Sequence, residues 1–172
     1  MLVFVTVGST KFDALIQAVL SADVLQCLQA KGYTSLVVQC GNSRTDEPVP
    51  NEGKTKMRRE GVDIELWKFK PSLEEEYENA DLIVSHAGSG TILDVLRRDK
   101  PLIVVPNPTL LDNHQQELAR ALSEQSYLLR SSVDPSELSQ VIRDLVPSEL
   151  RKFPAMDGSR FRQILDEEMG FL

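Results

Sequence analysis

The amino-acid sequence predicts an α/β fold, a single doubly wound domain built around a parallel sheet. Short apolar runs rich in β-branched residues alternate along the chain with stretches whose apolar residues recur at helical spacing. Glycine-containing turns join several of these runs to the helical stretch that follows. At 172 residues the chain has the length of one ordinary domain, and alternating strands and helices give right-handed crossovers that cover both faces of a parallel sheet.

The first part of the chain begins with an apolar run, Leu2–Val7, that predicts the first strand. The helical spacing that follows ends at Gly32, which fits the C′ position of a helix. Ser35–Cys40 is the next expected strand. Residues 41–60 are polar, contain two prolines and predict a long loop that is either functional or poorly ordered. We interpret its basic run, Lys54–Arg59, as a solvated loop.

The rest of the chain continues the alternation. A strand at Val62–Phe69 precedes a short helix, Ser72–Asn79, which opens at Pro71. The run Asp81–Ser85 has the composition of a strand buried on both faces. The later elements show the same two patterns, in chain order a helix around Ile92–Leu96, a strand Pro101–Pro106, a helix Asp112–Leu122, a strand Ser126–Arg130 and a helix Pro135–Leu145.

The domain is expected to comprise residues 1–147, and residues 148–172 form a separate helical tail. From Phe161 to Met169 the apolar residues of this tail fall on one helical stripe. Two interpretations remain open, since the stripe can pack on its own domain or dock onto a partner chain.

Composition limits the classes of function. The formal net charge of −7 disfavours a nucleic-acid-binding surface, which needs clustered Lys and Arg. No apolar run approaches the roughly 20 residues of a membrane-spanning helix, and the N-terminus has the pattern of a strand and not of a signal peptide. We interpret Cys27 and Cys40 as small buried side chains, which fits a reducing compartment.

Four segments with unusual residues are expected at the edge of the sheet where the parallel strands end, which we call the carboxyl edge. Ligands of open α/β sheets bind there. These segments are Gly8-Ser9-Thr10, Phe69-Lys70-Pro71, His86–Thr91 and Asn107–Gln116.

The third segment combines two glycines with the start of a helix. Gly88 and Gly90 allow close approach of a ligand, and the N–H groups of Ser89, Gly90 and Thr91 favour an anion. Asp94 lies one turn later, where a carboxylate can accept hydrogen bonds from ribose hydroxyls. The alternative is a tight turn capped by Ser89, followed by a solvated aspartate.

The fourth segment surrounds a helix start with Asn113, Gln115 and Gln116, whose amides suit sugar hydroxyls. Gln115 has the capping-box spacing from Asp112, so Gln116 is the stronger candidate. His86 and His114 are the only histidines and are weak candidates for a catalytic base; without a third ligand they predict no metal site.

Taken together, TVGST, FKPSLEEEYENADLIVSHAGSGTILDVL and KPLIVVPNPTLLDNHQQELARAL resemble the C-terminal half of a GT-B glycosyltransferase, the glycosyltransferase family 28 C-terminal domain. The resemblance covers roughly residues 2–129. It extends to the eukaryotic UDP-N-acetylglucosamine transferase of dolichol-linked N-glycan precursor assembly and to the bacterial enzyme that makes lipid II. It implies that the domain is Rossmann-like and binds a sugar nucleotide.

The resemblance also implies roles for individual residues. Those expected to bind the donor UDP-GlcNAc are Gly8, Ser9 and Thr10 at the diphosphate or domain cleft, the backbone near Phe69 at uracil, His86, Gly88, Ser89, Gly90 and Thr91 at the diphosphate, Asp94 at the ribose in place of a bacterial glutamate, and Gln115 and Gln116 at the GlcNAc hydroxyls. The catalytic base stays unidentified.

The implied activity is transfer of GlcNAc from UDP-GlcNAc to dolichol-diphosphate-linked GlcNAc, with inversion and without a cofactor or metal ion. Because a GT-B enzyme has two halves and this chain has room for one, a membrane-anchored acceptor-binding subunit is the expected partner. The chain itself, with no transmembrane segment, would be cytoplasmic and peripheral on the cytosolic face of the endoplasmic reticulum.

Two other classes of function are alternatives to this one. One is a non-catalytic module that binds a nucleotide sugar. The other is a dinucleotide-binding domain, which is disfavoured because GST, and not a G-x-G-x-x-G pattern, follows the first strand.

Overall fold

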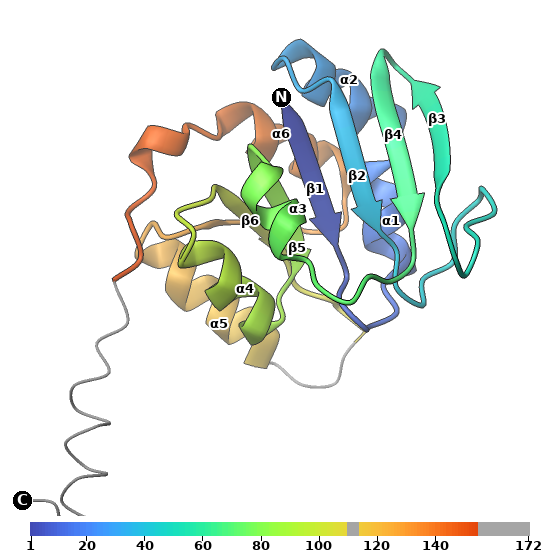
Figure 1. Ribbon diagram of the computed structural model, residues 1–172. Helices are drawn as coiled ribbons and strands as arrows, with labels where there is room; N and C mark the ends of the chain where they lie inside the picture. The colour runs from blue at the N-terminus through green and yellow to red at the C-terminus, as the bar shows by residue number, and fades with distance from the viewer. Residues whose placement is uncertain (110–113, 155–172) are drawn as a thin grey trace, which may run out of the picture.

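The computed structural model describes residues 1–109 and 114–154, and these contain one twisted sheet with helices on both faces (Figure 1). The strand order is β3-β4-β2-β1-β5-β6-β7, with β3 antiparallel to β4 and every other pair parallel. The strands are β1 (Leu2–Thr6), β2 (Ser35–Gln39), β3 (Thr55–Arg59), β4 (Val62–Trp67), β5 (Leu82–His86), β6 (Leu102–Val105) and β7 (Leu129–Arg130). The predicted doubly wound α/β class is confirmed.

The helices divide between the two faces of the sheet (Figure 1). One face is covered by α1 (Asp13–Val19), α2 (Ala22–Ala30) and α6 (Pro135–Asp144), and the other by α3 (Glu74–Asn79), α4 (Ser89–Leu96) and α5 (His114–Glu124). A short 3-10 turn, Pro147–Glu149, follows α6. Each face has its own buried apolar cluster, which explains why β1 and β5 are apolar on both sides.

The order of the parallel strands reverses at the centre of the sheet. From β1 the chain proceeds through β2 to β4 on one side, and from β5 through β6 to β7 on the other. The loops that follow β1 and β5 therefore diverge to opposite faces and leave a crevice at the carboxyl edge between them. This is the point where the sequence places Gly8-Ser9-Thr10 and His86–Thr91.

The helical spacing before Gly32 belongs to two helices and not to one. The helix is interrupted at Leu20 and Ser21. The Ser21 side chain is the N-cap of α2, and its hydroxyl accepts a hydrogen bond from Val24 N at 3.4 Å. Gly32 has φ +85° and is the predicted C′ residue, since Tyr33 N donates to Leu28 O across it at 2.9 Å.

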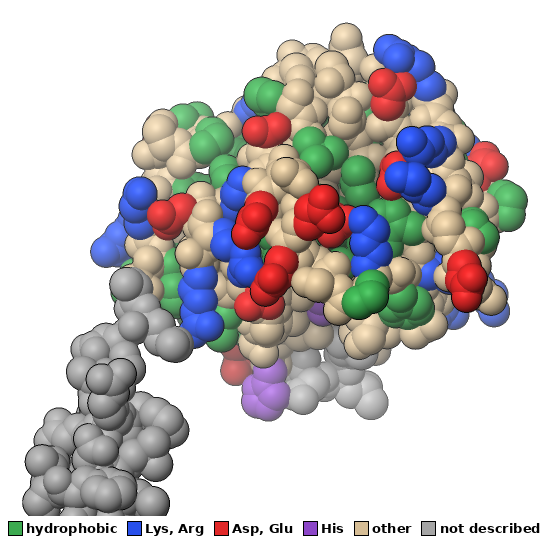
Figure 2. Space-filling view, viewed as in Figure 1, with side chains coloured by type: hydrophobic (Ala, Val, Ile, Leu, Met, Phe, Trp, Pro, Cys, Tyr) green, Lys and Arg blue, Asp and Glu red, His purple; other side chains and the backbone are tan. Residues whose placement is uncertain are grey.

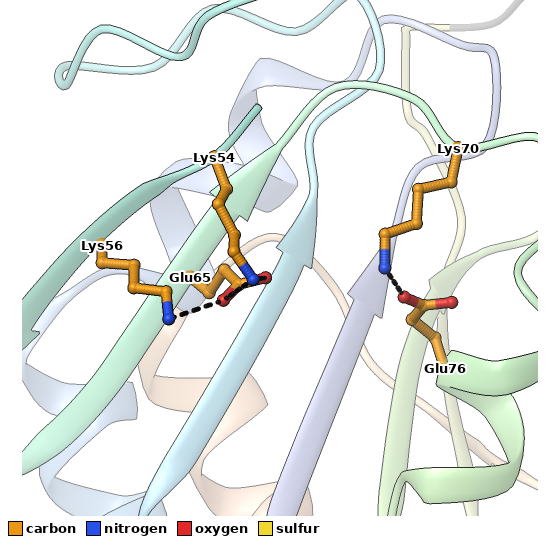
Figure 3. A network of polar contacts seen from close by, with 5 residues as sticks. All are labelled: Lys54, Lys56, Glu65, Lys70 and Glu76. Carbon is orange, nitrogen blue, oxygen red and sulfur yellow. Dashed lines mark hydrogen bonds and ion pairs between the residues drawn. The ribbon is translucent and has the colours of Figure 1, made fainter. Parts of the chain in front are cut away.

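The interpretation of Lys54–Arg59 as a solvated loop is wrong, because most of it forms β3 at the edge of the sheet. Its side chains alternate, with Lys56 and Arg58 exposed. The basic groups are compensated by carboxylates of β4. Lys54 Nζ lies 2.9 Å and Lys56 Nζ 3.5 Å from Glu65 Oε2 (Figure 3), and Arg58 pairs with Asp63 at 3.0 Å. With only Met57 as an apolar residue, the strand lacks the hydrophobic alternation that would identify it.

Acidic and basic side chains are interspersed over the face seen in Figure 2, and neither sign gathers into one large patch there. Cys27 and Cys40 are buried free thiols, as predicted. Burial raises the pKa of the Cys40 thiol to about 11, so the thiol stays protonated near neutral pH. No helix within the described ranges is both long and apolar enough to cross a membrane.

The first residues of the predicted tail pack on the domain. The ring of Phe153 lies 5.2 Å from that of Tyr127, and Arg151 N donates to Ser126 O at 2.8 Å. The apolar stripe from Phe161 to Met169 lies outside the described residues. The boundary at residue 147 therefore stays a prediction, and so do the two interpretations of the stripe.

Candidate functional site

The loop between β1 and α1, residues 7–12, is one wall of the crevice, and we call it the first loop. Gly8 has φ +61°, a backbone conformation that glycine adopts without strain. The hydroxyl of Thr10 donates to Val7 O at 2.6 Å and thereby closes the turn. Its side chain therefore serves the loop itself, and the exposed Ser9 is the residue of this loop that presents a hydroxyl to solvent.

The imidazole of His86 fills the space between the first loop and the start of α4. A Cβ added to Gly8 would lie 2.8 Å from His86 Cε1, and one added to Gly88 would lie 2.4 Å from His86 Nε2. Both distances are shorter than real side-chain contacts, so both positions require glycine for packing. His86 is 7% exposed and joins the two loops as a spacer.

The start of α4 is open where a ligand would approach. Gly88 is the N-cap residue, and no side chain of the described residues caps the first turn, so the alternative of a turn capped by Ser89 is not observed. A Cβ added to Gly90 would meet no atom within 4 Å. The two glycines thus differ, because Gly88 makes room for His86 whereas Gly90 leaves open space beside uncapped N–H groups that favour an anion.

Thr91 and Asp94 face the helix that precedes β5. Burial raises the pKa of Tyr77 on α3, the hydrogen bond with the Thr91 side chain opposes this, and the Asp94 carboxylate adds to the rise. The Thr91 side chain therefore lies near Tyr77, and the Thr91 N–H is in the first turn of α4. Asp94 is exposed on the side of α4 near α3, which the loop carrying Phe69 joins to β4.

Phe69 follows β4 and Lys68, with half of its surface, 52%, exposed. The next residue anchors this loop, because the Lys70 ammonium contacts Glu76 on α3 (Figure 3) and lies 4.8 Å from the centroid of the Trp67 ring. An exposed aromatic ring on a held loop suits a planar ligand such as a nucleobase.

The described residues that follow β6, 106–109, are held by Asn107, which is buried. Its Oδ1 accepts hydrogen bonds from the N–H and the hydroxyl of Thr109, at 3.0 and 2.8 Å, and its own N–H donates to Gln115 Oε1 at 3.4 Å. Gln115 is thus half-buried and held by the loop, whereas Gln116 is exposed. Asn113 lies outside the described residues.

A cavity of about 310 Å³ separates this loop from the first loop, lined by residues 11–14 and 107–109. His114 begins α5 with its side chain 83% exposed and its Nδ1 4.0 Å from Glu117. In residues 1–109 and 114–154 no three His, Cys, Asp or Glu side chains are grouped so that they could hold a metal ion.

The sequence prediction missed Thr6 and Gln39, whose buried side chains connect the ends of β1, β2 and β4 beneath the first loop. The available signal was a polar residue within each apolar strand run. Neither spacing nor composition separates such residues from ordinary strand polarity.

The pH dependence of stability should report the environment of His86. Burial lowers the pKa of His86, against a smaller opposing effect of the Thr6 backbone, and its Nδ1 has no hydrogen-bond partner among residues 1–109 and 114–154. The folded protein therefore binds this proton less readily than the unfolded chain, where histidine titrates near a pKa of about 6.5. The free energy of unfolding should fall as the pH drops below that value, and His86 should contribute no pH dependence above it.

Urea unfolding at about pH 7.5 and about pH 5.5 measures this difference. The His86→Asn variant should lose part of the acid destabilisation. His114→Asn, which removes the exposed histidine, should keep it. Equal pH dependence in the wild type and His86→Asn would contradict the assignment.

The chain is similar to known proteins in both sequence and fold. The family model described as the glycosyltransferase family 28 C-terminal domain matches residues 2–167. The chain is 42% identical over 125 residues, 73% of its length, to the UDP-N-acetylglucosamine transferase subunit ALG13 of Mus musculus. It is 36% identical over 191 residues to the protein of that name in Cryptococcus neoformans, with 97% of this chain and 96% of that protein covered.

The chain spans about 10% of the length of the Mus musculus protein and of its Homo sapiens counterpart. Among solved structures it is similar to the NMR structure of ALG13, with a TM-score of 0.65 and 24% identity over 95% of this chain and 94% of that one. It is also similar to Acinetobacter baumannii MurG, with a TM-score of 0.68 and 20% identity over 98% of this chain and 49% of that one. At these identities the two structures support the fold alone.

Proposed function

The chain belongs to the glycosyltransferase family 28 C-terminal domain family, and from this we propose that it is the donor-binding, catalytic subunit of a UDP-GlcNAc-dependent N-acetylglucosaminyltransferase. The observation that carries the proposal is the junction at the carboxyl edge. There the first loop and the uncapped start of α4 lie on the two sides of the His86 ring, and the space beside Gly90 is open. This is a site for an anion such as the diphosphate of a sugar nucleotide.

The other parts of the donor follow from the positions of the neighbouring residues. Asp94 would accept hydrogen bonds from the ribose, and the segment around Phe69 would contact uracil. The GlcNAc hydroxyls would meet the amides at the start of α5, where the exposed Gln116 is freer to do so than Gln115, whose Oε1 already accepts a hydrogen bond.

In the proposed reaction, a hydroxyl of dolichol-diphosphate-linked GlcNAc gives up its proton to a base and attacks the anomeric carbon of the donor sugar with inversion. The bond from that carbon to the diphosphate oxygen breaks, and its electron pair leaves with UDP. The N–H groups of the first turn of α4 would stabilise the negative charge that accumulates there, without a metal ion or cofactor. Because His86 is buried between two loops, the exposed His114 is the more accessible of the two candidate bases.

The acceptor would be supplied by a second, membrane-anchored subunit that provides the other half of a GT-B enzyme. Two observations support this part of the proposal. The described residues contain one sheet, and the relatives are named as subunits. The chain would then act as a peripheral protein on the cytosolic face of the endoplasmic reticulum.

Calorimetric titration of the chain with UDP-GlcNAc, UDP and ADP tests donor binding. We expect the uridine ligands to bind at least about tenfold more tightly than ADP, which corresponds to about 1.4 kcal/mol, and EDTA to leave this affinity unchanged. Equal affinity for ADP, or no binding by the chain alone or with its partner subunit, would contradict the proposal.

A transfer assay then separates the enzyme from a non-catalytic module. The chain and the partner subunit are combined with labelled UDP-GlcNAc and a dolichol-diphosphate-GlcNAc acceptor. Product is expected only when both subunits are present. Donor binding without transfer in the complex would favour the non-catalytic module.

A further inference from the structure

The six residues Gln39–Arg44, which we call the support segment, begin at the last residue of β2 and lie against the first loop. We infer that this segment positions the first loop, and that Gln39 fixes the loop in relation to the end of β4. The inference rests on the proposed function in one respect, because it assigns the two connected regions to the diphosphate and nucleobase ends of the donor.

Gln39 joins the ends of three strands through one side chain. It is 2% exposed. Thr6 Oγ1 donates to Gln39 Oε1 at 2.6 Å, and Gln39 Nε2 donates to Gly8 O at 2.9 Å and to Lys68 O at 2.7 Å. Both amide hydrogens and the amide oxygen are thus used within the protein, so Gln39 acts through the groups that it holds and not by touching a ligand.

Gly41 brings the backbone of the support segment directly against the first loop. Its φ is +54°, and an added Cβ would lie 2.7 Å from Gly8 O and 3.1 Å from Thr10 O. Its N–H donates to Lys68 O at 3.1 Å, so this carbonyl is held by two residues of the segment. A larger residue at position 41 would displace the first loop.

The last three residues of the segment continue these contacts along the first loop and into α1. The contacts are Asn42 Nδ2 to Ser9 O at 3.2 Å, Phe12 N to Ser43 Oγ at 2.8 Å, and Arg44 N to Asp13 Oδ1 at 2.9 Å. Five of the six residues therefore contact the loop or the first residue of α1, and the loop takes its conformation from a segment more than 25 positions away in the sequence.

The pattern of donors has a consequence for anion binding. The carbonyl oxygens of Gly8 and Ser9 carry partial negative charge and would repel a diphosphate. Gln39 and Asn42 supply hydrogen-bond donors to these two oxygens and hold them toward the support segment. The same Gln39 amide donates to the carbonyl of Lys68, the residue before Phe69. The N–H of Gly41 also donates to this carbonyl, so the nucleobase end keeps one support when the Gln39 amide is removed.

The test compares Gln39→Met, which keeps the approximate size of the side chain and removes its hydrogen bonds, with Val38→Ala. Val38 is the fully buried neighbour on β2 that packs in the cluster beneath α1 and α2, so its truncation lowers stability without removing a hydrogen bond to the first loop. Titration with UDP and UMP compares a ligand that has a diphosphate with one that lacks the second phosphate.

We expect Gln39→Met to lower the affinity for UDP at least about tenfold and that for UMP less than about threefold, while Val38→Ala changes neither by more than about twofold. Unchanged UDP affinity in Gln39→Met, or a loss for UDP and UMP in the same proportion, would overturn the inference. If Gln39→Met does not fold, Asn42→Ala replaces it, because this variant removes the exposed contact to Ser9 O. The affinity for UDP should again fall more than that for UMP, and both losses should be smaller than those expected for Gln39→Met.

Amide hydrogen exchange tests the positioning without any ligand, and so separates it from the proposed function. Exchange at residues 8–12 should accelerate in Gln39→Met relative to Val38→Ala. Acceleration together with no nucleotide binding by the wild type would retain the positioning and reject the donor assignment. Exchange at the wild-type rate in Gln39→Met would reject the positioning itself.

Discussion

Replacing Gly90 with alanine is expected to leave the folded protein equally or more stable while lowering its affinity for UDP at least about tenfold. Gly90 is the second residue of α4, where alanine is favoured over glycine by up to about 1 kcal/mol in helical propensity. The added Cβ would meet no protein atom within 4 Å. It would instead occupy the open space in which the diphosphate is proposed to lie, and Gly90→Val should have a larger effect on affinity.

Thermal unfolding and calorimetric titration of the same preparations measure the two effects. Ser136, the second residue of α6, is an exposed matched control on the opposite face of the sheet, and Ser136→Val should leave UDP affinity unchanged. A Gly90→Val variant that binds UDP like the wild type would reject the placement of the diphosphate. If Gly90 only turned the chain, its replacement would lower stability and leave affinity intact.

Replacing Gly88 with alanine is expected to have the opposite balance and to destabilise the protein by about 2–3 kcal/mol. The added Cβ would lie 2.4 Å from His86 Nε2, and the imidazole cannot move toward the first loop because it already contacts Gly8. Removing the imidazole should relieve this clash. The double variant Gly88→Ala/His86→Ala should therefore be within about 1 kcal/mol of His86→Ala alone.

Urea unfolding of the wild type, both single variants and the double variant completes the cycle. A coupling energy close to zero would mean that Gly88 and His86 act independently, and it would contradict the predicted clash. His86→Ala also removes the spacer between the two loops, so UDP affinity should fall in this variant even though its stability is partly retained.

The fold was predictable where burial dictates the residue type. Strands such as β5 lie between two apolar clusters, and only apolar residues satisfy both, so the run is visible in the sequence. By contrast β3 pairs on one edge only and places Lys56 and Arg58 in solvent, so polar residues satisfy it equally well. The break between α1 and α2 is not visible in the sequence pattern, because the apolar spacing continues through Leu20.

The candidate site was predictable at its glycines and less so at its polar residues. Gly8, Gly88 and Gly90 lie at the carboxyl edge, as expected. Gly8 and Gly88 must be glycine because they pack against His86, and the sequence alone does not show which neighbour a glycine contacts. Thr10 was expected to face a ligand, yet its hydroxyl bonds within the protein. Gln39 gave no clear signal because two of the three partners of its side chain are backbone carbonyls, which every residue possesses.

The ion pairs that join β3 to β4 also bear on how the chain behaves at high concentration. An edge strand offers unpaired backbone groups to any other extended chain, which makes long apolar edges prone to aggregation. On β3 a second strand would have to desolvate Lys56 and Arg58 and disturb their pairing with Glu65 and Asp63. The row of charges that hid this strand from sequence analysis thus acts as a barrier to the growth of the sheet beyond its own chain.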